Sequence, residues 1–401
     1  MTDWSYPDTD DQIDPHLAKF LYEQHCALLI VEDLPFDSEF GIDLSSFRTR
    51  ENFKGVKMIP PGVHFVFASA VDKSTNQCGP RCGFYHNFTA KELLVKRWST
   101  SDEDFDDSYE VSEEQRERYL ADIRGLDKYL GSYRYSTYKT YLALTDKLTA
   151  SLVQDLVPRN GRIRSVPYLV SQTVTHKQEL DSDKLADKPK RRTLRSDDER
   201  TSKPIDEEDL LPDLKPAQET VIRFTKLATC GGLPRESSGQ QQQPMTSQFI
   251  TQYHLDSTLR LEQSYVGESG RDRLLGEFQF AFITLIIGHV YECFEHWRNI
   301  LILVCSADAG LVKYPGFFVQ FALILEHQLD QVSGDIFEDI TQTDNLIRHY
   351  VDIFIQNVQQ TPGIDRKLAS NVTRLRGVLE NKLGWIFELE PDDERPVIVE
   401  L

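Results

Sequence analysis

The chain has 401 residues, of which 40% are hydrophobic and 10% aromatic, and its formal net charge at pH 7 is −19. This length exceeds what one ordinary core needs and predicts two or three domains. The acidic balance argues against a general affinity for nucleic acid, because phosphate binding needs a cationic face. We therefore expect protein partners and no direct contact with nucleic acid.

The cellular compartment is also constrained by composition. Six cysteines are too few for a disulfide framework, and residues 1–14 lack the apolar segment of a signal peptide. The longest nearly apolar run, residues 278–287, is far shorter than the ~20 residues of a membrane span. We expect a reduced intracellular compartment and no membrane contact.

Residues 15–175 predict a β-rich domain with flanking helices. Strands are expected over residues 27–31, 56–59, 63–70, 84–88 and 93–98, and the Gly- and Pro-punctuated stretch 40–85 is typical of a strand meander. Pro60, Pro61 and Gly62 are a strong turn signal. Helices are expected over residues 16–24, 112–130 and 136–156. The second would open with a capping box at Ser112 and end at Gly131.

Residues 176–245 have the composition of a linker. Charged residues dominate residues 178–216, and a glutamine tract follows at residues 240–243. A short apolar segment interrupts the charged and glutamine-rich stretches. We expect it to dock on one of the domains near residues 221–227, because a free linker gains no stability from burying Phe224. The basic run from Lys188 to Arg195 is either a nuclear-import signal or solvated linker, and Ser196 beside it is a possible phosphorylation site.

Residues 246–390 predict an all-helical bundle or short solenoid. Helices are expected over residues 246–265, 274–305, 317–329, 335–342, 346–358 and 365–383. A single helix over 274–305 would measure about 48 Å at ~1.5 Å per residue, which is too long for such a domain. We therefore expect a hairpin, with one helix ending at Gly288 and an antiparallel partner starting at Val290.

Residues 391–401 read as an acidic spacer followed by a tail strand. Its candidate protein-binding residues are Val397, Ile398, Val399 and Leu401, and period two places the first, third and fourth of them on one face. The strand either packs on its own domain or adds to a partner's sheet. Burying three apolar side chains contributes about 5–9 kcal/mol, whereas ordering five residues costs about 1–2 kcal/mol each. These two free energies nearly cancel, so the tail alone would bind weakly and would act as one of several linked contacts with a partner.

One group of residues is tempting as a zinc site. Cys78, Cys82 and His86 supply three ligands at unusual spacing, and tetrahedral zinc needs a fourth. Cys26 or His64 could complete the set in space. We interpret all of them instead as ordinary residues of the β-rich domain, and we predict no metal.

A second group, His289, Cys293 and His296, lies at helical spacing but lacks an HExxH pattern, so we interpret these as core and rim residues. Glu292, Glu295 and Arg298 would mark the solvated edge of that helix. Phosphate loops, nucleophile elbows and kinase motifs are not found in the sequence. We therefore predict a protein that is not an enzyme and binds no cofactor.

Several sequence blocks together resemble a known family. They are FGID (40–43), FKGVKMIPPGVHF (53–65), GPRCGFY (79–85), RWST (97–100), IRF (222–224), LGEFQFAF (275–282), GHVYECFEHW (288–297) and PVIVEL (396–401). With these blocks the chain resembles the AAR-two (AAR2) family of splicing factors, which are assembly factors of the U5 snRNP. The blocks cover both halves in order, and the central linker does not match.

The resemblance implies an α+β multidomain protein with a sandwich-like, β-rich N-terminal domain and an all-α, VHS-like C-terminal domain. It implies binding to the RNase H-like and JAMM/MPN-like domains of the largest U5 snRNP protein, alongside other U5 proteins. By this resemblance the chain would hold off the helicase and RNA until its release, in the cytoplasm and the nucleus. The alternative is a generic two-domain intracellular adaptor unrelated to splicing, whose tail packs on its own sheet.

Overall fold

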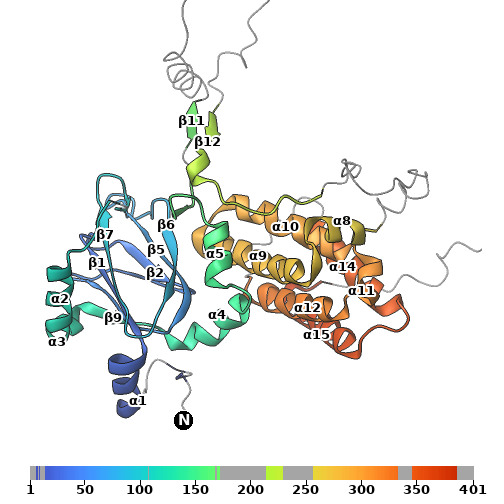
Figure 1. The fold of residues 1–401 in the computed structure, drawn as a ribbon, viewed down its shortest axis with the longest axis horizontal. Helices are drawn as coiled ribbons and strands as arrows, with labels where there is room; N and C mark the ends of the chain where they lie inside the picture. Colours follow the sequence, from blue (N-terminus) through green and yellow to red (C-terminus); the bar gives the residue numbers. More distant parts are fainter. Residues whose placement is uncertain are drawn as a thin grey trace, which may run out of the picture.

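The computed structural model describes residues 14–106, 108–167, 169–171, 214–228, 256–332 and 346–385, together with residues 6, 7 and 9. Within these residues the architecture is α+β. A β-rich N-terminal half contains two five-stranded sheets, and the C-terminal half is helical (Figure 1). The predicted fold class is confirmed, whereas the predicted boundaries near residues 175, 245 and 390 lie outside the described residues.

The strands follow the expected order along the chain, with several additions. They are β1 (Ala27–Glu32), β2 (Glu39–Ile42), β3 (Ser45–Arg48), β4 (Gly55–Ile59), β5 (Gly62–Ser69), β6 (Cys82–Phe88), β7 (Leu93–Ser99), β8 (Asp104–Phe105), β9 (Leu130–Ser132), β10 (Ile163–Arg164), β11 (Leu169–Ser171) and β12 (Leu214–Pro216). One sheet has the order β8-β7-β1-β4-β9 and the other β10-β6-β5-β2-β3, while β11 and β12 pair with each other. The short strands β2, β3 and β8 to β12 were not predicted.

The Pro60–Gly62 turn carries the chain from the first sheet to the second. The strands on either side of it, β4 and β5, belong to different sheets, so the prediction of a simple meander is wrong at this point. Gly62 has a φ of +139°, which only glycine adopts readily. His64 stabilises the turn through hydrogen bonds between Nε2 and the Pro60 carbonyl (2.8 Å) and between Nδ1 and Asp43 Oδ2 (2.6 Å).

Each sheet is covered on both faces. Along β5 the side chains alternate, so that Val66 lies in the core between the sheets while Phe65 and Phe67 join the core shared with the helices. On the opposite side, Leu28 and Ile30 of β1 pack under the segment that holds α2 (Glu113–Ala121) and α3 (Ile123–Leu126). Continuous burial along β1 follows from this layering.

Two long helices predicted for the N-terminal half are interrupted in the structure. The stretch expected to form one helix over residues 112–130 contains α2, α3 and a 3₁₀ turn, Asp127–Tyr129, and Gly131 lies in β9 instead of ending a helix. The Ser112 hydroxyl accepts from Gln115 N at 3.3 Å. The Gln115 side chain, however, donates to Glu32 of β1 at 2.7 Å. Only half of the capping box therefore forms.

The second predicted helix, residues 136–156, divides into α4 (Tyr138–Thr145) and α5 (Ala150–Leu156). The break allows a close approach by α9 (Gly267–Gly288). A Cβ atom on Gly276 would lie 2.2 Å from Leu152 Cδ2 and 2.9 Å from the Lys147 carbonyl oxygen. Lys147 N donates to Gln279 Oε1 at 2.8 Å, so α9 satisfies a backbone group that the break exposes. The contact with α9 decides where this helix ends.

The remaining helices are α1 (Pro15–Phe20), extended by a π-helical turn (Leu21–His25), and, in the C-terminal half, α8 (Thr258–Ser264), α10 (Tyr291–Cys305), α11 (Asp308–Lys313), α12 (Pro315–Gln331), α14 (Leu346–Gln360) and α15 (Arg366–Leu383). The α9–α10 hairpin is confirmed: α9 ends at Gly288, His289 takes a left-handed φ of 56° and Val290 precedes α10. The predicted helix over residues 335–342 lies outside the described residues, and α11 was not predicted. Among the described helices, none has the length and apolar character to cross a membrane.

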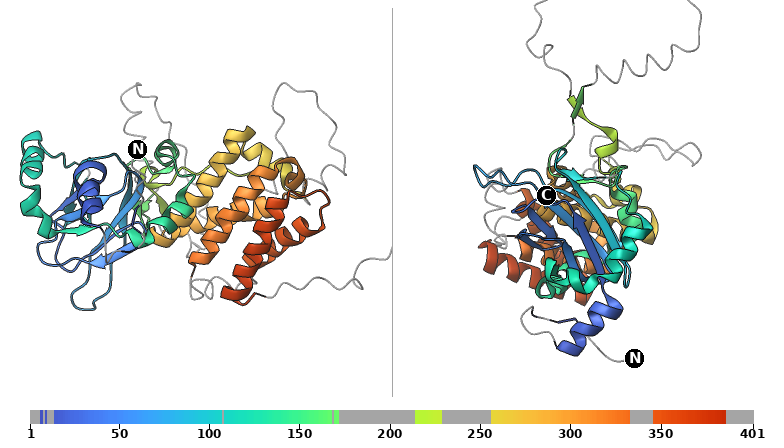
Figure 2. Two further views of the ribbon diagram at one scale, coloured as in Figure 1. Left: turned by 90° about the horizontal axis from the view of Figure 1, so that it is seen from below. Right: turned by 90° about the vertical axis from the view of Figure 1, so that its left-hand side faces the viewer.

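One continuous core joins the two halves, which lie side by side (Figure 2). It contains Phe65 of β5, Leu144 of α4 and Phe280 of α9. At its centre the ring of Tyr85 on β6 lies 4.9 Å from that of Phe280, and the Tyr85 hydroxyl is 2.8 Å from Thr284 Oγ1. Such a large apolar contact holds the halves in one arrangement, since mobile domains share small polar interfaces.

Candidate protein-binding site at the domain junction

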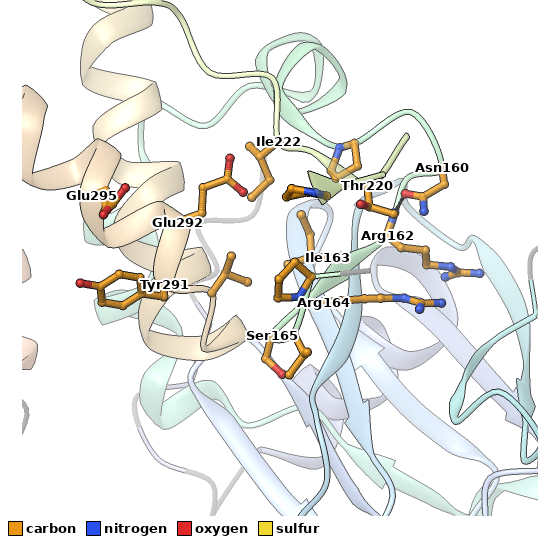
Figure 3. Close-up of a pocket in the computed structure, with 15 residues that line it drawn as sticks. Asn160, Arg162, Ile163, Arg164, Ser165, Thr220, Ile222, Tyr291, Glu292 and Glu295 are labelled. Carbon is orange, nitrogen blue, oxygen red and sulfur yellow. Dashed lines mark hydrogen bonds between the residues drawn. The ribbon is translucent and has the colours of Figure 1, made fainter. Parts of the chain in front are cut away.

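A pocket of about 440 Å³ opens where the two halves meet (Figure 3). Three parts of the chain line it: the stretch around β10, the region from β12 into the bridging segment (residues 217–228), and the start of α10. Its apolar lining includes Pro158, Ile163, Pro167, Pro216, Ile222 and Val290. This volume lies within the range of ligand and peptide pockets, which combine apolar walls with a few polar groups.

The rim of the pocket exposes large apolar side chains to solvent. Val166 is 56% exposed and Tyr291 is 66% exposed. Glu292 points toward Ile222, while Arg164 extends away from α10 (Figure 3) and is paired with Asp104. Desolvation at the pocket wall and the neighbouring Glu295 carboxylate raise the pKa of Glu292. The pocket thus combines apolar walls with the carboxyl groups of Glu292 and Glu295.

The bridging segment forms one wall of the pocket and is anchored to α5. Ile222 is 6% exposed and belongs to the shared core. Arg223 N donates to the Leu156 carbonyl (2.8 Å), and its guanidinium donates to the carbonyls of Gln154 (2.6 Å) and Val157 (2.9 Å). These carbonyls lie at the end of α5, where helical partners are missing, so Arg223 completes the C-terminus of that helix.

The other anchor of the bridging segment is a buried carboxylate, Glu277 of α9, which is 0% exposed. It accepts hydrogen bonds from Thr225 Oγ1 (2.5 Å), Thr225 N (3.2 Å), Tyr265 OH (3.0 Å), Arg273 Nε (2.9 Å) and His296 Nε2 (3.2 Å). Burial opposes ionisation, but the bonds from His296 and Thr225 outweigh it, and the pKa of Glu277 lies below its usual value. Glu277 thus joins the bridging segment, Tyr265 at the end of α8, α9 and α10.

Arg81, from the turn before β6, connects the two halves. Its guanidinium forms a bidentate pair with Glu39 (2.6 and 3.2 Å) and lies over the Phe67 ring at 4.5 Å. It also donates to the Ile287 carbonyl at 2.6 Å and to His289 Nε2 at 2.9 Å. A cation at the C-terminus of α9 is favourable because that end carries partial negative charge.

The contact between Arg81 and His289 predicts a modest dependence of stability on pH. Desolvation and the Arg81 charge lower the pKa of His289, with Glu39 acting in the opposite direction. The folded protein therefore binds fewer protons than the unfolded chain. The stabilising contribution is present above about pH 6.5, the ordinary histidine value, and is lost as the pH falls through the lowered pKa. Thermal unfolding between pH 7.5 and 5.5 measures this loss.

The matched control is His289→Asn, because asparagine tolerates the left-handed backbone and accepts a hydrogen bond but does not titrate in this range. We expect the wild type to lose more stability than His289→Asn on acidification. Parallel curves for the two proteins would show that another group is responsible, such as His25, whose pKa is also lowered by burial.

The residues considered as zinc ligands have separate roles. Cys78 is exposed, whereas Cys82 and Cys26 belong to the core between the sheets. His86 pairs with Glu92 at 2.7 Å, and His64 stabilises the Pro60–Gly62 turn. Within the described part of the chain, no group of three or more His, Cys, Asp and Glu side chains is placed to hold a metal ion.

The helical group His289, Cys293 and His296 is likewise divided among different partners. Its two histidines bind Arg81 and Glu277, while Cys293 is 0% exposed. Burial raises the pKa of Cys293 well above its ordinary value and that of Cys82 to about 12. Because the thiolate is the reactive form of cysteine, these two thiols are poor nucleophiles.

The tail residues Val397, Ile398, Val399 and Leu401, the phosphorylation candidate Ser196 and the basic run 188–195 lie outside the described residues. The structure instead brings forward residues that sequence reasoning did not single out, above all Glu277 and Arg81. A signal for Glu277 exists in the sequence. Glu277, Gln279 and Thr284 are polar residues within an apolar helix, and all three are fully buried. Polar groups in such positions need internal partners.

Comparison with known proteins matches both halves of the chain. A family model described as the AAR2 N-terminal domain matches residues 25–158, and one described as the AAR2 C-terminal repeat region matches residues 235–388. Relatives named "Protein AAR2 homolog" include those of Macaca fascicularis and Homo sapiens, each 34% identical over 97% of both chains. The Caenorhabditis elegans protein of that name is 31% identical over 94% of this chain and 98% of its own.

Proposed function

The chain belongs to the AAR2 family, and on this basis we propose that it is a non-enzymatic assembly factor of the U5 snRNP in pre-mRNA splicing. Its partner would be the largest U5 protein, bound through the RNase H-like and JAMM/MPN-like domains. While bound, the chain would keep the helicase and RNA away from those domains until release. We propose that it acts in both the cytoplasm and the nucleus.

The observation that carries this proposal is the agreement between the family match and the shared core. Both family regions occur in one chain, and a continuous core fixes them side by side. Two rigidly joined surfaces can hold two domains of one partner at a set separation, and linked contacts raise the effective concentration of each. Purification of the tagged protein from cells tests the proposal directly, and the largest U5 protein is expected as the dominant partner.

The tail strand is proposed to add to a sheet of the partner. Deleting residues 396–401 is then expected to weaken the complex about tenfold, or about 1.4 kcal/mol. Binding of the purified full-length chain to the purified partner domains measures the change. Unchanged affinity would remove the tail from the interface.

Two substitutions sharpen this test. Val397→Asp changes the face that the tail shares with Val399 and Leu401, whereas Ile398→Asp places the same charge on the opposite face. If only one face of the tail strand packs on the partner, the two substitutions weaken the affinity for the partner to different extents.

Phosphorylation of Ser196 is proposed as a means of regulation, since a phosphate beside the basic run 188–195 would pair with its arginines and lysines. Phosphopeptide mapping from cells is the test, and a residue that is always unmodified would end this idea.

The second candidate function is a two-domain adaptor unrelated to splicing. It is favoured by the junction pocket, whose apolar walls and Glu292 suit many partners with an apolar side chain next to a cation. The same purification distinguishes the two functions, because an adaptor of this kind would recover other proteins and no U5 component.

A further inference from the structure

A second pocket, of about 450 Å³, lies between the open edges of the two sheets. The strands β3 and β9 are the last strands of their sheets at this end, and both contribute to the lining. The pocket walls include the aromatic side chains Phe47, Phe53 and Tyr129. We call this hollow the edge pocket.

The edge pocket is cationic, although the chain as a whole carries a net charge of −19. Its lining residues include Arg48, Arg50, Lys128 and Arg134 against one carboxylate, Glu51. Within the described part of the chain, none of the four cations has a carboxylate partner. Four such cations around one hollow attract an anionic ligand.

The contacts that these cations do make leave their charge available. Arg48 donates to the main-chain carbonyls of Asp37 (3.1 Å) and Asn76 (3.4 Å), and Lys128 lies 4.8 Å from the centre of the Tyr129 ring. Arg50, Lys128 and Arg134 are exposed to solvent.

The main chain of β3 is also available along its outer edge. Thr49, which follows β3, exchanges main-chain hydrogen bonds with Ser38 and Asp37 on the β2 side. Because main-chain groups in an antiparallel ladder alternate in direction, those of Ser46 and Arg48 face away from β2. An extended peptide could therefore pair with β3 between the two sheet edges.

Charged residues at a sheet edge also have a simpler role, since they prevent edge-to-edge association of copies. Preventing such association requires neither charges of a single sign nor a pocket at the sheet edge. The edge pocket combines one sign of charge, aromatic walls and an open strand, and these features together match an extended acidic ligand.

We propose that the edge pocket binds an extended acidic peptide segment of a partner protein. The main chain of the peptide would pair with β3, and the carboxylates of the peptide would contact Arg50, Lys128 and Arg134. This binding site is independent of the proposed U5 partner and of the tail strand.

The test uses a fluorescein-labelled ten-residue peptide of alternating glutamate and valine, with anisotropy measured on the full-length protein. The double variant Arg50→Glu/Arg134→Glu is expected to bind at least about tenfold more weakly. The matched control is Arg118→Glu/Arg159→Glu, which makes the same charge change at exposed positions outside the pocket and should stay within about twofold of the wild type. Far-UV circular dichroism checks that both variants are folded.

Several results would overturn the proposal. If both double variants lose the same affinity for the peptide, the effect is one of overall charge. If a peptide of alternating lysine and valine binds equally tightly, the pocket does not recognise acidic side chains. Tighter binding of a ten-nucleotide oligouridylate, lost in the pocket variant alone, would assign the site to RNA instead. A peptide methylated on alternate main-chain amides should bind weakly, and unchanged affinity would contradict pairing with β3.

Discussion

Replacing Glu277 with glutamine is expected to lower the free energy of unfolding by about 3–5 kcal/mol, the usual cost of breaking a buried charged network. The carboxylate is fully buried and accepts from Thr225, Tyr265, Arg273 and His296. Glutamine has nearly the same shape, but its amide nitrogen is a donor and would face other donors. Chemical denaturation followed by circular dichroism measures the loss.

The substitution should also release the bridging segment, and hydrogen exchange should rise at residues 222–225 before other parts of the chain. The control is Glu262→Gln on α8, where a partly exposed carboxylate binds Lys313 at 2.7 Å. Surface pairs of this kind contribute about 0–1 kcal/mol. Equal losses for the two variants would mean that Glu277 is not the special anchor that its contacts indicate.

Arg81→Ala is the second substitution with a large expected effect, about 2–5 kcal/mol, because it leaves the nearly buried Glu39 without its cation. It also removes the donor to the Ile287 carbonyl at the end of α9. Since these contacts join the two halves, hydrogen exchange should rise on both sides, in β6 and in the last turn of α9. Arg81→Lys keeps the charge but loses the bidentate geometry, and it should give an intermediate value.

The matched control for Arg81 is Arg97→Ala. Arg97 also pairs with carboxylates, Glu32 and Asp33, and lies 3.8 Å from the centre of an aromatic ring, that of Tyr109. All of its contacts stay within the N-terminal half. A smaller loss with unchanged exchange in α9 is expected, and a comparable effect on α9 would contradict the role of Arg81 as a connector.

The main strands and the long helices of this fold could be predicted because their signals are local. The uninterrupted apolar run from Phe65 to Ala68 indicates a strand with two buried faces, and Gly288 marks the break in the central hairpin. Each signal depends on residues within a few positions, where backbone preference and side-chain period agree with the final packing.

The interrupted elements could not be predicted in the same way, because distant contacts decide them. The stretch 136–156 has the pattern of one helix, yet α9 packs closely at Gly276 and takes the Lys147 amide as a partner. Likewise, Leu130 forms a strand because the edge of β4 is available to it. Tertiary contacts of this kind override local preference.

The junction pocket also depends on long-range assembly. Its walls come from the stretch around β10, the bridging segment and the start of α10, and no period in the sequence relates these parts. Sequence analysis did indicate that residues near 221–227 dock, because a solvated linker gains no stability from a large apolar side chain such as Phe224. It could not show that Phe224 lies 3.9 Å from the ring of His296 or that Thr225 binds Glu277.

The pairing of β11 with β12 places Ser171 opposite Leu214, so the two ends of the stretch between these residues lie side by side (Figure 1). The entropy of closing a loop grows only slowly with its length. Insertions or deletions between these two residues therefore cost little, and the bridging segment still begins at the same place. The number of residues between Ser171 and Leu214 can therefore change without altering the geometry of either half.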